Sequence, residues 1–224
     1  MHVQVRGGGI RAGEAVAAAR VGIFGGAFNP PHIGHLILAQ EAHSQLGLDR
    51  VVLVPFGEPS HRRLDDDPGA EARLTMCEYA VAADARFAVS RIEVDRAGPS
   101  YTVDTLRALR QLAPDDELYL LLGGDQAAAL GSWHEPEEVL SLAVAAVGER
   151  DEWRREEIAE RLGGLCSPER VVFFEMPRVD VSSTLVRRHA RGGRPIRYYV
   201  PDKVANFIGA QSLYGASAPV GAAS

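Results

Sequence analysis

The chain has 224 residues, of which 46% are hydrophobic and 24% are charged, so it is long enough to bury the core of one domain. Its net charge of −6 disfavours a dedicated nucleic-acid binder, because affinity for a phosphate backbone needs clustered Lys and Arg. No apolar run approaches the roughly 20 residues that span a bilayer, and Arg6, Arg11 and Glu14 interrupt the region where a signal peptide would be apolar. We therefore expect a cytoplasmic protein that does not bind membranes.

The start of the chain carries a glycine-rich pattern. Gly7, Gly9 and Ala12 have the spacing G-x-G-x-x-A of a dinucleotide-binding loop, but that loop needs an acidic residue about 20 positions further on, where Asn29 stands. An NAD-dependent oxidoreductase that uses the Gly7 region remains an alternative. We expect three regions: a disordered leader at 1–19, a single domain at 20–214 and a flexible tail at 215–224.

From Arg20 onward, short β-branched apolar runs alternate with longer amphipathic stretches. This alternation predicts a three-layer, Rossmann-like α/β fold, with a parallel sheet and helices on both faces. The predicted strands are 20–24, 50–55, 87–94, 118–123, 143–147 and 171–175. The predicted helices are 33–46, 70–83, 101–112 and 153–162, with two short ones after Val181 and Pro201.

Single residues support several of these boundaries. Gly47 suits the end of the first helix, Ser100 can cap the third, and Pro201 suits the first turn of the last. Ligands of such sheets bind outside the carboxyl ends of the strands. We therefore look for chemistry in the loops that follow Phe24, Pro55, Gly123 and Glu175.

The turn after the first strand has the features of a phosphate site. Gly25 and Gly26 let an anion approach the backbone, and His32 and His35 lie three apart across a helix start, where phosphate is attracted. Gly34 between them leaves room for a flat ligand. Two solvated histidines are the alternative for such a pair, but the glycine turn at the carboxyl end of the first strand favours a ligand site. A zinc site lacks a third ligand at a suitable spacing.

These residues carry a family resemblance. The segment from Gly25 to His35 resembles the H-x-G-H signature of the nucleotidyltransferase superfamily. Four later segments resemble motifs of the nicotinate-nucleotide adenylyltransferase family, in that family's order. They are Pro55 to Arg62, Pro99 to Leu106, Gly123-Gly124-Asp125 with Trp133, and Val181 to Arg187.

The resemblance implies an activity and a set of site residues. The 5′-phosphate of nicotinate mononucleotide would attack the α-phosphorus of ATP, giving deamido-NAD and pyrophosphate, with Mg²⁺ held mainly by the ATP phosphates. The catalytic residues would be His32, His35 and Arg187. The ATP-binding residues would be Gly25, Gly26, Phe28, His32, His35, Asp125, Arg150, Ser182, Ser183, Thr184 and Arg187. The acceptor-binding residues would be Arg62, Tyr101, Thr102 and Trp133.

Other readings remain open at this point. Ser182 to Thr184 can be an ordinary helix cap, and Trp133 can be a core residue. The sequence departs from the family pattern at Phe56-Gly57, where asparagine is common, and at His134, where an aromatic hydroxyl is common. The acceptor could therefore be nicotinamide mononucleotide or phosphopantetheine, and a non-catalytic nucleotide sensor is a further alternative. The chain could also form a homo-oligomer.

Overall fold

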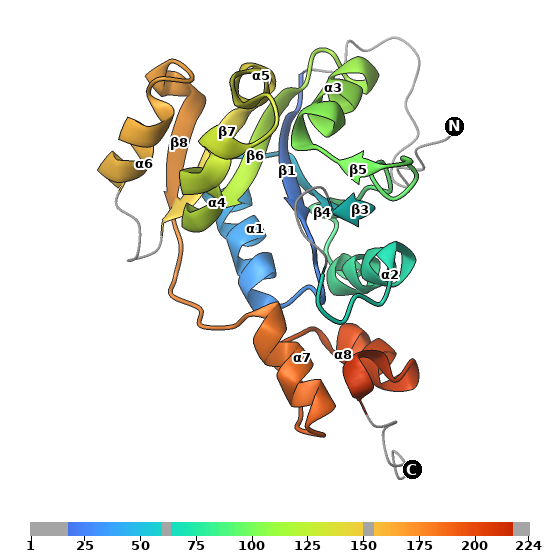
Figure 1. Ribbon diagram of the computed structural model, residues 1–224. Helices are drawn as coiled ribbons and strands as arrows, with labels where there is room; N and C mark the ends of the chain where they lie inside the picture. The colour runs from blue at the N-terminus through green and yellow to red at the C-terminus, as the bar shows by residue number, and fades with distance from the viewer. Residues whose placement is uncertain (1–17, 60–63, 150–154, 217–224) are drawn as a thin grey trace.

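The computed structural model of the protein describes residues 18–59, 64–149 and 155–216 (Figure 1). The dinucleotide-type pattern near Gly7 lies outside these residues. Six strands form the central sheet: β1 (Arg20–Gly26), β2 (Arg50–Pro55), β4 (Phe87–Val89), β6 (Glu117–Gly123), β7 (Val144–Glu149) and β8 (Val171–Glu175). Their order is β4-β2-β1-β6-β7-β8, and all neighbours pair in parallel. The predicted Rossmann-like α/β fold is confirmed, with its ligand crevice between the carboxyl ends of β1 and β6.

Eight helices accompany the sheet in the described residues, and none of them is both long and apolar enough to cross a membrane. They are α1 (Ile33–Leu46), α2 (Ala70–Val81), α3 (Thr102–Leu112), α4 (Gly124–Ala129), α5 (Pro136–Leu142), α6 (Arg155–Leu162), α7 (Ser183–Arg191) and α8 (Asp202–Ala210). Helices α4 and α5 were not predicted, because helices of six and seven residues are too short to show a clear apolar period.

The strands alternate their side chains between the two faces of the sheet. In β6, Leu118, Leu120 and Leu122 pack in one core cluster with apolar residues of α3, α4, α5 and α6. Tyr119 and Leu121 point the other way and pack with residues of α1 and α2. Both faces are therefore buried, which explains why these strands read as continuous apolar runs.

The predicted strand 87–94 is wrong beyond Val89. The chain turns at this point: Asp95 N–H donates to the Arg91 carbonyl, and Arg91 also forms an ion pair with the Asp95 carboxylate. A second, two-stranded sheet that was not predicted joins β3 (Glu58–Pro59) to β5 (Pro99–Ser100). This small sheet brings the loop after β2 next to the start of α3.

The three boundary predictions have different outcomes. Gly47 ends α1 in the left-handed conformation, as expected. Ser100 does not cap α3, because Tyr101 stands at the cap position and the Ser100 hydroxyl instead accepts from Gly57 N–H at 3.1 Å. Pro201 comes directly before α8 rather than within its first turn.

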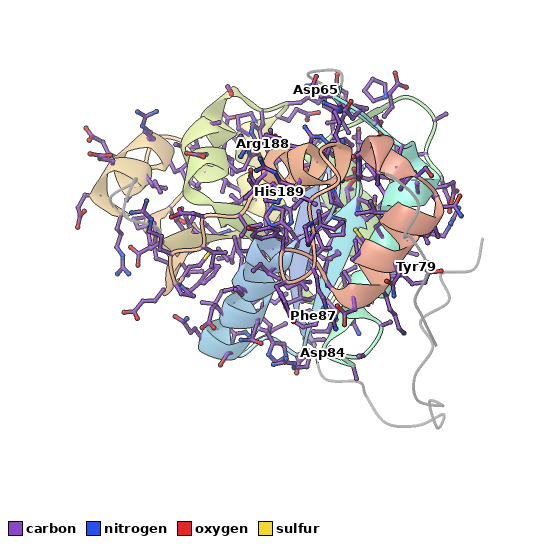
Figure 2. All side chains as sticks on the ribbon, turned by 90° about the horizontal axis from the view of Figure 1, so that it is seen from below. Asp65, Tyr79, Asp84, Phe87, Arg188 and His189 are labelled. Carbon is purple, nitrogen blue, oxygen red and sulfur yellow. The ribbon has the colours of Figure 1, made fainter. Side chains whose placement is uncertain are left out.

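The C-terminal part of the chain forms a separate apolar cluster with α2. Val186 of α7, Val204 of α8 and Tyr214 pack there against Met76. Figure 1 shows α7 and α8 together beyond the end of the sheet toward which the strands run. Seen from below, Arg188 and His189 lie on α7, while Tyr79 lies beside α8 (Figure 2), where its ring contacts Phe207.

Candidate active site

A cavity of about 670 Å³ lies at the carboxyl ends of β1 and β6. It therefore occupies the crevice that the strand order predicts. One wall comes from the β1–α1 turn and the other from the starts of α3 and α4 and the segment around Trp133. The expected site residues that line it are Gly25, Gly26, His32, His35, Tyr101, Thr102, Asp125, Trp133 and Ser182.

The glycines of the turn leave room for different reasons. A Cβ built on Gly25 would meet no atom within 4 Å, so this position opens directly onto the cavity. A Cβ on Gly34 would lie 3.1 Å from the ring of His32. Gly34 therefore makes space for the His32 imidazole, and it also lines the cavity, where the sequence predicted room for a ligand.

The two histidines form a stacked pair at the start of α1. Their ring centroids are 3.7 Å apart, and the Nδ1 atom of His35 accepts from the His32 backbone N–H at 3.1 Å. Because Nδ1 accepts, a neutral His35 carries its proton on Nε2. His32 occupies the N-cap position, so the pair stands at the positive end of the helix dipole.

Phe28 and Asn29 support the pair from beneath. Phe28 is only 1% exposed, and its ring packs edge-on against His35 at 5.1 Å, so it does not line the cavity as an ATP contact would. Asn29, 3% exposed, donates to the Asp65 carbonyl and accepts from the Tyr214 hydroxyl at 2.8 Å. The turn is thus fixed by residues far apart in the chain.

Arg187 lies behind the turn rather than in the wall of the cavity. Its guanidinium donates to the Asn29 carbonyl at 2.9 Å and forms an ion pair with Asp66 at 3.6 Å. Arg191 also pairs with Asp66. The single carboxylate of Asp66 thus offsets only one of these two positive charges.

The Ser-Ser-Thr segment does form a helix cap. Ser182 is the N-cap of α7, and its hydroxyl accepts from Leu185 N–H. Ser183 donates to the Pro30 carbonyl at 2.9 Å, and Thr184 accepts from Arg187. Only Ser182 of the three lines the cavity. Ser183 attaches the start of α7 to the β1–α1 turn, while Thr184 bonds to Arg187 within the same helix.

The opposite wall carries aromatic side chains. Trp133 lines the cavity and also packs against the core. His134 lies beside Tyr101 with the ring centroids 4.6 Å apart, and its side chain is 52% exposed. Thr102 is the first residue of α3, so the start of that helix faces the cavity.

Two expected site residues, Arg62 and Arg150, lie outside the described part of the chain. Asp125 is an exposed residue in the first turn of α4 and lines the cavity. In the described segments, no three His, Cys, Asp or Glu side chains gather closely enough to hold a metal ion.

Sequence reasoning missed two buried charged residues near the site. Arg73 is fully buried on α2, where its position in the first turn gave no sign of a role. Glu93 lines the cavity and accepts from the Thr105 hydroxyl. Burial raises the pKa of the Glu93 carboxyl above its ordinary value, and the hydrogen bond from Thr105 opposes that shift. A charged residue among apolar neighbours is the only signal that the sequence offers for either.

Comparison with known proteins agrees with this geometry. Residues 23–189 match the family model described as Cytidylyltransferase-like. The fold and the cavity with its stacked histidines, together with this match, define a protein of the nucleotidyltransferase class.

Curated relatives narrow the class to one family. A protein of Corynebacterium kroppenstedtii named "Probable nicotinate-nucleotide adenylyltransferase" is 41% identical over 205 residues, which cover 92% of this chain and 95% of that protein. A protein of the same name from Thermus thermophilus is 43% identical over 195 residues, covering 87% and 99%. The chain belongs to the nicotinate-nucleotide adenylyltransferase family.

Solved structures share the fold. The Plasmodium falciparum nicotinic acid mononucleotide adenylyltransferase complexed with NaAD has a TM-score of 0.73 at 17% identity, covering 89% of this chain and 98% of that chain. The sequence resemblance that predicted the family is therefore confirmed by relatives that match over most of their length.

Proposed function

We propose that this protein transfers the adenylyl group of ATP to the 5′-phosphate of nicotinate mononucleotide, a step of NAD biosynthesis. One observation carries the proposal: the stacked pair His32 and His35 lines the same cavity as Trp133 and the start of α3. A wall suited to phosphate and an aromatic wall therefore face one space, as we expect of a member of this family. A transfer between two bound nucleotides requires such an arrangement.

The ATP phosphates would lie over the β1–α1 turn. The open position of Gly25 lets an anion reach the backbone, and the start of α1 attracts negative charge. His35 would donate from Nε2 to an oxygen of the α-phosphate, because its Nδ1 is engaged by the His32 backbone. The His32 ring, which lies against the ring of His35, would contact the same triphosphate.

Arg187 would supply a fixed positive charge from the side of α7. Its bond to the Asn29 carbonyl ties it to the turn, so its charge would act on the bound phosphates from behind that turn. Ser182 would contribute its cap position at the start of the same helix. Ser183 would hold α7 against the turn, and Thr184 would help to orient the Arg187 guanidinium.

The acceptor would occupy the aromatic wall. Trp133 offers a face on which a pyridine ring can stack. The start of α3, at Tyr101 and Thr102, offers backbone N–H groups and a positive dipole end for the ring carboxylate. Asp125 can accept from ribose hydroxyls of the adenosine, and roles for Arg62 and Arg150 rest on the family resemblance alone.

The transfer needs no covalent intermediate on the protein. An oxygen of the acceptor phosphate forms a bond to the α-phosphorus as the bond to the bridging oxygen breaks, and pyrophosphate leaves with that oxygen. Mg²⁺, bound mainly by phosphate oxygens and water, would offset their charge. The residues of this chain then align the two nucleotides and donate to the charge that develops.

A panel of acceptors tests the proposal. Purified protein is incubated with ATP, Mg²⁺ and one acceptor at a time, and pyrophosphate release is measured. We expect the largest kcat/KM with nicotinate mononucleotide. Equal values with nicotinamide mononucleotide, or a preference for phosphopantetheine, would reject the acceptor, and no release with any of them would favour a nucleotide sensor.

A further inference from the structure

Arg73 stands out among the charged residues because it is entirely buried yet takes no part in the cavity wall. It lies in the first turn of α2, where a cation meets the unfavourable end of the helix dipole. Its position there therefore gives the helix no benefit. A buried guanidinium is retained only when its donors are satisfied.

The donors of Arg73 are shared between two loops that line the cavity. Nη1 donates to the Ala27 carbonyl at 3.2 Å and to the Phe56 carbonyl at 2.7 Å, while Nη2 donates to the Gly57 carbonyl at 2.9 Å. Nε donates to the Asp67 carboxylate at 3.0 Å, which neutralises the charge. Ala27 belongs to the turn after β1, and Phe56 and Gly57 follow β2.

The Phe56–Gly57 loop is also held on the side away from Arg73. Gly57 N–H donates to the Ser100 hydroxyl at 3.1 Å, just before α3. A Cβ on Gly57 would lie only 2.3 Å from the Glu93 carbonyl oxygen, so the two backbones are in close contact. A shift of the loop at Arg73 would therefore be passed on to the start of α3.

From these contacts we infer that Arg73 is a positioning residue that sets the spacing between the ATP side and the acceptor side of the cavity. The inference rests on the proposed function, since it assigns the β1–α1 turn to ATP and the Phe56–Gly57 loop with α3 to the acceptor. In-line attack needs the reacting atoms about 3–3.5 Å apart, and a misplacement of about 1 Å can cost about 10²-fold in rate. The Arg73 guanidinium, bonded to both loops, would keep this distance constant.

The substitution Arg73→Lys keeps the charge but cannot span three carbonyls and a carboxylate at once. We expect kcat to fall by about 10²-fold. ATP affinity, measured by titration calorimetry, should change little, because Asn29 and Ser183 still hold the phosphate turn. A residue that only stabilises the fold would instead lower the unfolding temperature and leave kcat unchanged at temperatures where the variant is folded.

Arg170 provides the matched control. It also donates to two backbone carbonyls, those of Leu140 at 2.8 Å and Ser141 at 2.9 Å, but it does not touch the loops of the cavity. Arg170→Lys should lower stability and keep the kcat of the wild type. Similar kcat losses in both variants would overturn the inference, because they would reflect general loosening of the fold.

A second variant covers the case in which Arg73→Lys does not fold. Asp67 is partly exposed and holds Arg73 from outside the cavity, so Asp67→Asn should fold and lower kcat in the same direction by a smaller factor. Unchanged kcat in Asp67→Asn would then overturn the inference. The activity of the wild type distinguishes the two proposals. If the wild type shows no adenylyl transfer to nicotinate mononucleotide, the proposed function is wrong. If it is active and the variants keep its kcat, only the role of Arg73 fails.

Discussion

The two walls of the cavity are built in different ways. On the phosphate side, Phe28, Asn29 and His32 are buried. Asn29 is hydrogen-bonded to α7, to the loop before α2 and to the C-terminal segment. On the aromatic side, His134 is half exposed, and Trp133 faces the cavity from a short connection. The phosphate side is thus fixed by many contacts that a substitution would disturb. The aromatic side has exposed positions where a substitution would disturb fewer contacts.

The largest expected effect lies on the phosphate side. His35→Ala removes the proposed donor to the α-phosphate, and kcat should fall by about 10²-fold or more, as for other donors to a developing anion. His43→Ala on the same helix is the control, because its ring lies in the last turn near Phe87. Steady-state kinetics with saturating ATP distinguishes them, and equal activity of the two variants would remove His35 from the mechanism.

Substitution of Gly34 tests the packing of the histidine pair without removing either ring. The added Cβ of Gly34→Ala would press on the His32 ring at 3.1 Å, so we expect kcat/KM to fall about tenfold, less than the roughly 10²-fold cost of a full 1 Å misplacement. Helix propensity should keep the fold as stable as before. Gly131→Ala, whose Cβ would be 3.5 Å from Leu165, should leave kcat/KM unchanged. A Gly34→Ala enzyme of normal activity would show that the pair tolerates displacement.

A substitution on the aromatic wall should affect only the acceptor. Trp133→Leu removes a stacking face worth about 0.5–1.5 kcal/mol, so KM for the acceptor should rise by up to about tenfold while KM for ATP stays the same. Trp133→Phe should recover most of the loss. If KM for ATP rises equally, the comparison between the two walls is wrong.

Loss of the hydrogen bond between the C-terminal segment and the β1–α1 turn should lower the free energy of unfolding. Tyr214→Phe leaves the buried Asn29 side chain without its hydroxyl donor, which should cost about 1–3 kcal/mol of unfolding free energy in denaturant titrations. Tyr79→Phe, at an exposed ring, is the control. Equal midpoints for the two variants would contradict the support assigned to Tyr214.

The smallest expected effect concerns Glu93 and pH. Burial raises the pKa of the Glu93 carboxyl in the folded protein. Between the ordinary carboxyl pKa and this raised pKa, the folded protein keeps a proton that the unfolded chain has released. The contribution of Glu93 to stability is therefore lost as pH rises through the folded-state pKa. Relative to wild type, Glu93→Gln should therefore be more stable near about pH 7 than near about pH 4. A difference in unfolding temperature that is the same at both pH values would contradict the shift.

The sequence predicted the parts of the molecule that depend on residues close to one another in the chain. The alternation of strands and helices identified the sheet, and the short segment from Gly25 to His35 identified one wall of the cavity, because its glycines and histidines lie close together in the chain. The predicted residues that line the cavity from elsewhere, such as Asp125 and Trp133, came from family resemblance rather than from their spacing.

Contacts between distant residues could not be predicted. The strand 87–94 was too long, because its apolar pattern continues into a turn held by Arg91 and Asp95. The role of Arg73 depends on carbonyl groups of Ala27 and Phe56, and every residue type presents a carbonyl. The burial of Phe28 likewise follows from packing against Phe24 and His35, so its place beneath the cavity has no local signal.

A crystal structure of the protein with Mg²⁺ and a non-reactive ATP analogue tests the central claim most directly. We expect the triphosphate over Gly25 and the start of α1, with Nε2 of His35 about 2.7–3.2 Å from an α-phosphate oxygen. The nucleoside should extend toward Asp125. A triphosphate bound elsewhere, or one that leaves both imidazoles without a phosphate contact, would contradict the account.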